Sequence, residues 1–250
     1  MTTLLAVEGV TVSFDGFTVL DGLDFAVDSG ELRFLIGPNG AGKTTLLDVI
    51  TGSVRPRSGR VVFAGGDVSS WSEQRRARRG IGRKFQTPAV FPTLTAYQNV
   101  EAALGCTGST AALFGTLPSH DRQRIDAVLD RVGLTERATT RAGALSHGEM
   151  QWLEIGILII GEPRLLLLDE PIAGMTRGER DHTGQLLESL AKDRAVVVVE
   201  HDMEFMRQFA RTVTVMHLGK VLIEGPVATV QEHPGVREIY LGPKRNRAAA

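Results

Sequence analysis

The sequence predicts an α/β protein whose parallel sheet is interrupted by a helical insertion. A glycine-rich loop at residues 37–45 joins an apolar strand to a helix. Two unbroken apolar runs, at 165–168 and 195–199, are typical of parallel strands that are covered on both faces. Helix-type segments dominate residues 95–161, between the glycine-rich loop and the first of these runs, and we place the insertion at about 87–161. The first 30 residues alternate short apolar runs with turn signals, which indicates an N-terminal antiparallel β subdomain.

The remaining elements follow from the chain in order. A helix is expected to run from Lys43 to a stop at Gly52, and a turn and a strand follow it. Residues 72–79 form an arginine-rich helix, and a short strand follows at 81–85. After Pro163, a crossover helix lies between the two apolar strands, and a hairpin that turns at 218–220 closes the fold. We expect one domain over 1–243 and a flexible tail over 244–250.

Composition excludes several classes of protein. The chain has 250 residues, with 42% hydrophobic, 23% charged and a net charge of -1, so no basic field is present to hold nucleic acid. A single cysteine, Cys106, excludes an internal disulfide. The N-terminus lacks the pattern of a signal peptide, and the most apolar region is too short and broken to span a bilayer. Any membrane role must therefore come through a partner.

The basic residues gather in one segment. Without interleaved aromatic side chains, they indicate a solvated helix face rather than a nucleic-acid site. The members of this basic segment are Arg75, Arg76, Arg78, Arg79, Arg83 and Lys84.

The loop GPNGAGKT at 37–44 fits the pattern G-x-x-x-x-G-K-[ST] at every position. Such a loop wraps its backbone N–H groups around phosphate oxygens, and a mere glycine-rich turn would not need the flanking strand and helix. Lys43 is expected to reach the β- and γ-phosphates and the Thr44 hydroxyl to hold Mg²⁺. The predicted nucleotide-binding residues of the loop are Gly37, Pro38, Asn39, Gly40, Ala41, Gly42, Lys43, Thr44 and Thr45.

Polar side chains at three strand ends complete a candidate ATP site. Asp169 ends the strand LLLLD, where a buried carboxylate needs a cation, and Mg²⁺ would supply it. Glu170 follows and can polarise the attacking water. His201, after the strand AVVVV, could align that water, although a lone histidine at a strand end is more often structural. Gln86 follows another short strand and could sense both Mg²⁺ and the water.

A fourth motif, LSHGE at 145–149, begins a helix. Ser146 is a natural N-cap and Glu149 stands three residues later, so local evidence favours a capping box. The functional alternative is that this free helix N-terminus grips a γ-phosphate presented by another subunit.

In this order, the motifs resemble the ABC ATPase family across nearly the whole chain. Residues 37–45 resemble Walker A, Gln86 the Q-loop glutamine, and Asp169 with Glu170 the Walker B pair. His201 resembles the switch histidine. The signature LSGGQ is matched by LSHGE, whose residues facing a partner's ATP are Ser146, His147, Gly148 and Glu149.

The resemblance also marks an adenine site and two departures. Phe14 stands where the family places an aromatic ring on adenine, with Phe17 as a nearby competitor. His147 replaces the first signature glycine, and AGMT at 173–176 replaces the usual D-loop. Glu170 and His201 are retained, so the resemblance implies an ATPase that is competent for hydrolysis with ATP and Mg²⁺.

The family mechanism implies partners. Two ATPase subunits would sandwich two ATP molecules, and closure would drive two membrane permeases that are fed by an extracytoplasmic solute-binding protein. The resemblance implies a second, non-identical ATPase subunit, although a homodimer of the isolated chain stays open. The chain would lie in the cytoplasm, on the inner face of the membrane. Val90, Phe91 and Leu94 are equally candidates for permease contacts and for packing inside the insertion.

The finer resemblance is to importers. The strings VSFDGF, GIGRKFQ, LSHG, AGMT and VEHDM favour the urea transporter ATPase within the branched-chain amino-acid importer group, with branched-chain amino acids as the runner-up. A soluble ABC ATPase that acts on DNA or ribosomes is disfavoured. The interval before the signature is short and contains no long coiled coil, and the chain carries one cassette.

Overall fold

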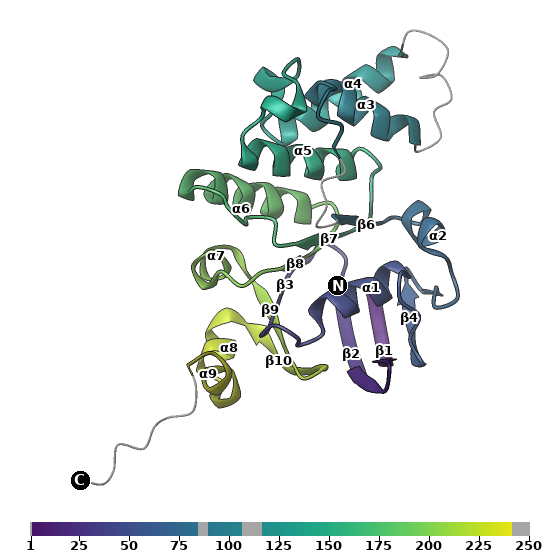
Figure 1. Cartoon of the computed structure of the whole chain (residues 1–250), viewed down its shortest axis with the longest axis vertical. Coiled ribbons are helices and arrows are strands. Elements are labelled where there is room, and N and C mark those ends of the chain that lie inside the picture. The colour runs from purple at the N-terminus through teal and green to yellow at the C-terminus, as the bar shows by residue number, and fades with distance from the viewer. Residues whose placement is uncertain (1, 85–89, 107–116, 242–250) are drawn as a thin grey trace, which may run out of the picture.

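A computed structural model describes residues 2–84, 90–106 and 117–241, and it confirms the predicted fold class (Figure 1). One sheet has the strand order β2-β1-β4-β5 and the other has the order β10-β9-β3-β8-β7-β6. Gln86 and the predicted tail at 244–250 lie outside the described residues. Within the described ranges, no helix combines the length and the apolar content that a membrane span requires.

The N-terminal sheet is antiparallel, as the alternating pattern predicts. Buried residues recur at alternate positions along much of β1 and β2, so one face packs on the core. The strands of this sheet are β1 (Thr3–Phe14), β2 (Phe17–Asp28), β4 (Ser58–Phe63) and β5 (Gly66–Asp67).

The larger sheet carries the candidate site. Its strands β3, β6, β7, β8 and β9 run parallel, and β10 pairs antiparallel with β9 through the predicted turn at 218–220. Every residue of β3, β7 and β8 is buried, which is why these segments are unbroken apolar runs. The strands are β3 (Leu32–Ile36), β6 (Ile81–Lys84), β7 (Leu165–Asp169), β8 (Ala195–Val199), β9 (Thr212–His217) and β10 (Lys220–Pro226).

Helices cover the sheets and form the insertion. Helix α1 (Lys43–Thr51) ends at Gly52, whose φ of 89° provides the predicted left-handed stop. The inserted helices lie together at one end of the molecule, between β6 and β7 in the chain (Figure 1). They are α3 (Ala96–Cys106), α4 (Ser119–Arg131) and α5 (His147–Ile159), with 3₁₀ turns at Thr135–Arg137 and Ala142–Ala144. The other helices are α2 (Glu73–Arg78), α6 (Arg177–Ala191), α7 (Met203–Phe209), α8 (Val227–Glu232) and α9 (Pro234–Leu241).

The prediction of one solvated basic face is wrong for Arg76. Its side chain is only 1% exposed and donates hydrogen bonds to the carbonyl groups of Val49, Ile50 and Ser69. The first two carbonyls end α1, where helix carbonyl groups lack intrahelical partners and carry partial negative charge. Arg76 therefore caps α1 from the neighbouring helix α2.

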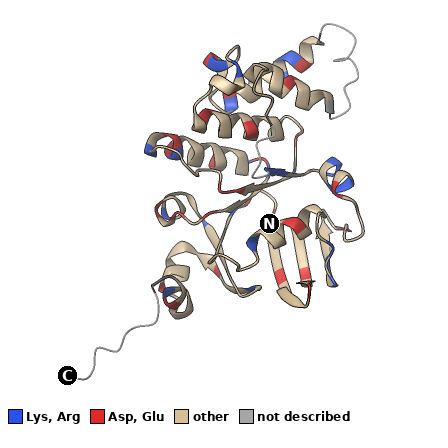
Figure 2. Ribbon diagram, viewed as in Figure 1, with Lys and Arg blue, Asp and Glu red and all other residues tan. Residues whose placement is uncertain are grey.

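The prediction is also wrong for the two basic residues on β6. Arg83 pairs with Asp48 of α1. Lys84 Nζ lies 3.1 Å from Glu154 Oε2 on α5, and both of these side chains are 6% exposed. Figure 2 shows the basic residues on both α2 and β6. The solvated-face interpretation holds for the exposed members on and beside α2, namely Arg75, Arg78 and Arg79.

Candidate functional site

The glycine-rich loop lines a cavity of about 350 Å³ together with Asp169 and Glu170. The loop follows β3, and the two acids end and follow β7, so the cavity lies at the carboxyl ends of parallel strands, where α/β sheets bind ligands. Val19 and Val199 add apolar walls that sequence reasoning missed. The structure thus brings the predicted loop and the predicted acids together.

Two glycines give the loop its path. Gly37 has a φ of 152°, and a Cβ atom added there would lie 2.3 Å from the carbonyl oxygen of Met216. Gly42 has a φ of 100°, and a Cβ atom there would lie 2.7 Å from Leu20 Cδ2. No side chain fits at either position. The cradle at the start of α1 therefore depends on glycine, as a phosphate-binding loop requires.

Lys43 lies over this loop. Its Nζ donates hydrogen bonds to the carbonyl oxygens of Gly37 at 2.7 Å and Pro38 at 3.0 Å. Burial lowers the pKa of the ammonium group, and the charges of Asp169 and Glu170 oppose that effect. The ammonium is held by two neutral carbonyl groups, which phosphate oxygens could replace with stronger, charge-assisted bonds.

Asp169 fits the predicted Mg²⁺ role. Asp169 is 7% exposed, and its Oδ2 atom has no hydrogen-bond partner among the described residues. Burial raises the pKa of this carboxyl group, with the charge of Arg83 acting in the opposite direction. A buried carboxylate oxygen without a partner suits a cation. With the Thr44 hydroxyl in the same cavity, the donor set is the oxygen type that Mg²⁺ takes, together with water and phosphate.

Glu170 and His201 lie side by side. His201 Nδ1 is 3.5 Å from Glu170 Oε1, and the two side chains are 71% and 51% exposed. Glu170 has a φ of 48°, a left-handed conformation that is uncommon for a residue with a side chain. Its backbone N–H donates to the carbonyl oxygen of Val199 at 2.9 Å, which fixes this turn. Backbone strain of this kind gathers at functional sites.

Sequence reasoning missed Glu200, which lies behind this pair. Glu200 is 2% exposed, and its carboxylate accepts hydrogen bonds from the backbone N–H groups of Ile172 at 3.2 Å and His201 at 3.3 Å. Burial raises its pKa to about 7. The available signal was an acid placed directly after the buried strand 195–199, where a carboxylate is costly without donors. Glu200 therefore connects the segment after Glu170 with the histidine.

The LSHGE motif forms the capping box that its local pattern predicts. Ser146 Oγ accepts from the N–H of Glu149 at 3.1 Å, and Glu149 Oε2 accepts from the N–H of Ser146 at 2.8 Å. Ser146 and His147 are exposed, whereas Gly148 is buried. The capping box accounts for this motif within one chain, and the predicted contact with a second subunit stays a prediction.

The two departures from the family pattern contact each other. His147 Nε2 lies 2.9 Å from the carbonyl oxygen of Ala173, and because a carbonyl only accepts, this nitrogen carries the proton. A Cβ atom on Gly174 would lie 3.2 Å from the His147 ring. The histidine in place of glycine therefore joins the start of α5 to the AGMT segment.

The predicted adenine-stacking ring of Phe14 does not line the cavity. Phe14 pairs with Phe17 across the turn between β1 and β2. The residues are 47% and 80% exposed, so either ring has a free face to stack on a base. Val19, on the same strand as Phe17, does line the cavity. The choice of Phe14 stays a prediction.

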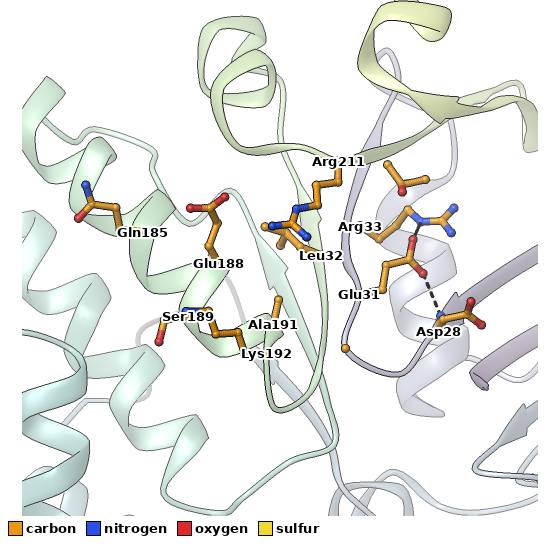
Figure 3. A pocket seen from close by; sticks show the side chains of 12 residues that line it. Asp28, Glu31, Leu32, Arg33, Gln185, Glu188, Ser189, Ala191, Lys192 and Arg211 are labelled. Carbon is orange, nitrogen blue, oxygen red and sulfur yellow. Dashed lines mark hydrogen bonds and ion pairs between the residues drawn. The ribbon is translucent and has the colours of Figure 1, made fainter. Parts of the chain in front are cut away.

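A larger cavity, of about 720 Å³, lies elsewhere (Figure 3). It is lined by Leu32 and Thr212, which begin β3 and β9, so it lies at the amino ends of the strands and away from the glycine-rich loop. Glu31 there accepts hydrogen bonds from the Asp28 backbone and from Arg33. Both acidic and basic side chains line it and the glycine-rich loop is absent from its lining, so it does not resemble a phosphate site.

Known proteins resemble this chain both in sequence and in structure. A family model described as ABC transporter matches residues 20–173. The branched-chain amino acid transport ATP-binding protein BraF of Pseudomonas aeruginosa is 33% identical over 96% of this chain and 98% of its own. The phosphonates import ATP-binding protein PhnC 1 of Rhodopseudomonas palustris is 35% identical over 90% and 85%. The ADP conformation of MJ1267, an ATP-binding cassette of an ABC transporter, superposes with a TM-score of 0.87 at 30% identity, over 97% of this chain and 100% of that one.

Proposed function

This chain belongs to the ABC transporter family as an ATP-binding subunit that hydrolyses ATP, and from that premise we propose that it energises the import of branched-chain amino acids. The observation that carries the choice of solute is the match to BraF, which runs from end to end of both proteins. The match to PhnC 1 covers less of either chain, although its identity is slightly higher. Urea is the second candidate, favoured by the strings GIGRKFQ and LSHG.

The chain binds ATP and Mg²⁺, and we assign the roles from the geometry of the cavity. The loop at 37–45 cradles the phosphates, and Lys43 turns from its carbonyl partners to the β- and γ-phosphates. Thr44 and Asp169 hold Mg²⁺, with Gln86 assigned to the same ion from the sequence pattern. Glu170 takes the proton of the attacking water. His201, whose Nδ1 atom lies 3.5 Å from Glu170 Oε1, aligns that water.

The working assembly contains two ATPase subunits. Ser146, His147, Gly148 and Glu149 at the start of α5, of which Ser146 and His147 are exposed, would meet the ATP held by the partner's loop. The second ATPase is expected to be a different chain, with a homodimer possible for the isolated protein. Two permeases and a solute-binding protein complete the importer, which places this chain on the inner face of the membrane.

Uptake by cells that lack this subunit tests the choice of solute. Labelled leucine, urea and a phosphonate are supplied separately, and each uptake rate is compared with that of cells in which the intact chain is restored. Loss and recovery of leucine uptake alone supports the proposal. Loss of urea uptake with normal leucine uptake would replace it with the second candidate, and an isolated loss of phosphonate uptake would reject both.

Phe91 is the residue we propose for contact with a permease. Its side chain is 57% exposed, whereas Val90 packs against the buried cluster of the insertion. Asn99 holds this loop, because its side-chain amide accepts from the N–H of Phe91 at 2.8 Å and donates to the carbonyl groups of Phe91 and Thr95. The backbone of the loop is therefore fixed independently of the ring of Phe91.

We expect Phe91→Asp to release the permeases while the isolated chain keeps its ATPase activity, since the ring contributes little to the core. Co-purification from detergent-solubilised membranes measures the association, and phosphate release measures the activity. Asn99→Ala is the contrasting variant, because it removes the hydrogen bonds that hold the loop. It should lower the midpoint of thermal unfolding in addition to weakening the association with the permeases. If Phe91→Asp loses ATPase activity and thermal stability together, the ring belongs to the core.

A further inference from the structure

The carboxylate of Glu179 lies against the beginning of helix α5. Ser146 Oγ donates a hydrogen bond to Glu179 Oε1 at 3.3 Å. A Cβ atom built on Gly148 would lie only 2.3 Å from the same oxygen, so the carboxylate packs directly on the first turn of α5. Ser146 is exposed and Glu179 is half-buried, and neither belongs to the buried core, so this contact can open without disturbing that core.

The two oxygens of Glu179 have different tasks. Oε2 accepts from the N–H and the hydroxyl of Thr176, both at 2.8 Å, and thereby caps helix α6. Oε1 faces α5 and takes no part in that cap. Capping therefore explains the presence of a glutamate at this position, but it does not explain the contact with Ser146.

Glu179 is an anion at neutral pH. Hydrogen bonds from Thr176 and then from Ser146, with a smaller effect of the charge on His147, hold the pKa of Glu179 below its ordinary value. The N-terminus of a helix favours negative charge, so the first turn of α5 is a suitable place for this carboxylate. The contact between His147 and Ala173 joins α5 to the segment before Thr176. This contact brings the carboxylate of Glu179 within reach of the first turn of α5.

We propose that Glu179 is an internal anion that occupies the signature motif of its own chain and competes there with the γ-phosphate of the partner's ATP. The proposal rests on the assignment of Ser146 and Gly148 as phosphate contacts, made above under the proposed function. A phosphate that approaches these residues meets a carboxylate of like charge, which must move away before two chains can close around ATP. Glu179 thus raises the ATP concentration that closure requires.

Glu179→Gln tests this directly in the full chain that also carries Glu170→Gln, which prevents hydrolysis. Glutamine keeps an oxygen that can cap α6, but it removes the negative charge. We expect the ATP concentration for half-maximal dimerisation, measured by light scattering, to fall by about tenfold. With Glu170 intact, steady-state ATP turnover at low ATP should rise. An unchanged or higher ATP requirement, without a rise in turnover, would overturn the proposal.

Two further variants separate the explanations. Thr176→Ala weakens the α6 cap but leaves the carboxylate, so it should not lower the ATP concentration required for dimerisation. If this variant lowers that concentration as much as Glu179→Gln does, the effect belongs to the cap. Ser146→Ala tests the premise. If it leaves dimerisation unchanged, the signature assignment fails. If it prevents dimerisation while Glu179→Gln has no effect, only the internal-anion inference fails. None of these measurements depends on the transported solute.

Discussion

Glu170→Gln is expected to lower ATP turnover by between about 100-fold and 10,000-fold, the range that a general base contributes. Glutamine has the same shape but cannot accept the proton of the attacking water. The side chain is 51% exposed and its neighbour His201 is 71% exposed, so the exchange disturbs no buried packing. Nucleotide affinity should remain within about twofold, because the loop at 37–45 and Lys43 are unchanged.

Phosphate release measures turnover, and a fluorescent ATP analogue measures binding. The hydrolysis-deficient chain should accumulate as an ATP-bound dimer on gel filtration, since closure no longer leads to hydrolysis. Glu188→Gln, on the exposed surface of α6, is the matched control and should keep full turnover. Undiminished turnover in Glu170→Gln would reject its assignment as the base and leave His201 as the remaining candidate beside the cavity.

Local patterns were sufficient for the elements that surround the nucleotide. The strand, glycine-rich loop and helix at 32–51 could be predicted from adjacent residues, because the apolar run, the glycine spacing and the stop at Gly52 form one continuous local pattern. The capping box at Ser146 is local in the same sense and was predicted as such. The burial of β3, β7 and β8 on both faces follows from apolar runs that cannot face water on either side.

Contacts between distant segments were not predictable in this way. Arg76 and Lys84 were assigned to a solvated face, because an arginine or lysine is exposed by default and its partner is not visible in the sequence. Their partners, the carbonyl ends of α1 and Glu154 of α5, come from other elements. The link between His147 and Ala173 was hidden for the same reason. The sequence marked both segments as unusual, but only the fold brings them together.

Glu200 shows how such a hidden contact changes the dependence of stability on pH. Burial raises its pKa in the folded chain from an ordinary value of 4.5 to about 7. Between these two values the folded state holds a proton that the unfolded state has released. The free energy of unfolding should therefore decrease as pH rises through this window. Above pH 7 the ionised carboxylate costs the folded state up to about 3 kcal/mol.

Glu200→Gln removes this cost, because an amide does not ionise. We expect the variant to be more stable than the unaltered chain at pH 8, with the gain reduced by about 1 kcal/mol for the imperfect replacement of the bond to the His201 N–H. At pH 5 the carboxyl group is protonated in the folded chain, so the difference should vanish or change sign. Urea unfolding at pH 5, 6, 7 and 8, without nucleotide and Mg²⁺, measures the difference.

Glu204→Gln supplies the comparison on the adjacent exposed surface, and its effect on the free energy of unfolding should be small. A constant difference between Glu200→Gln and the unaltered chain across the whole range would mean that Glu200 does not change protonation on folding. The same variant should also slow ATP turnover, because the carboxylate joins the backbone of Ile172, just after Glu170, to that of His201. A chain that gains stability at pH 8 while it loses turnover would indicate that this buried charge is retained for positioning the catalytic pair rather than for holding the fold.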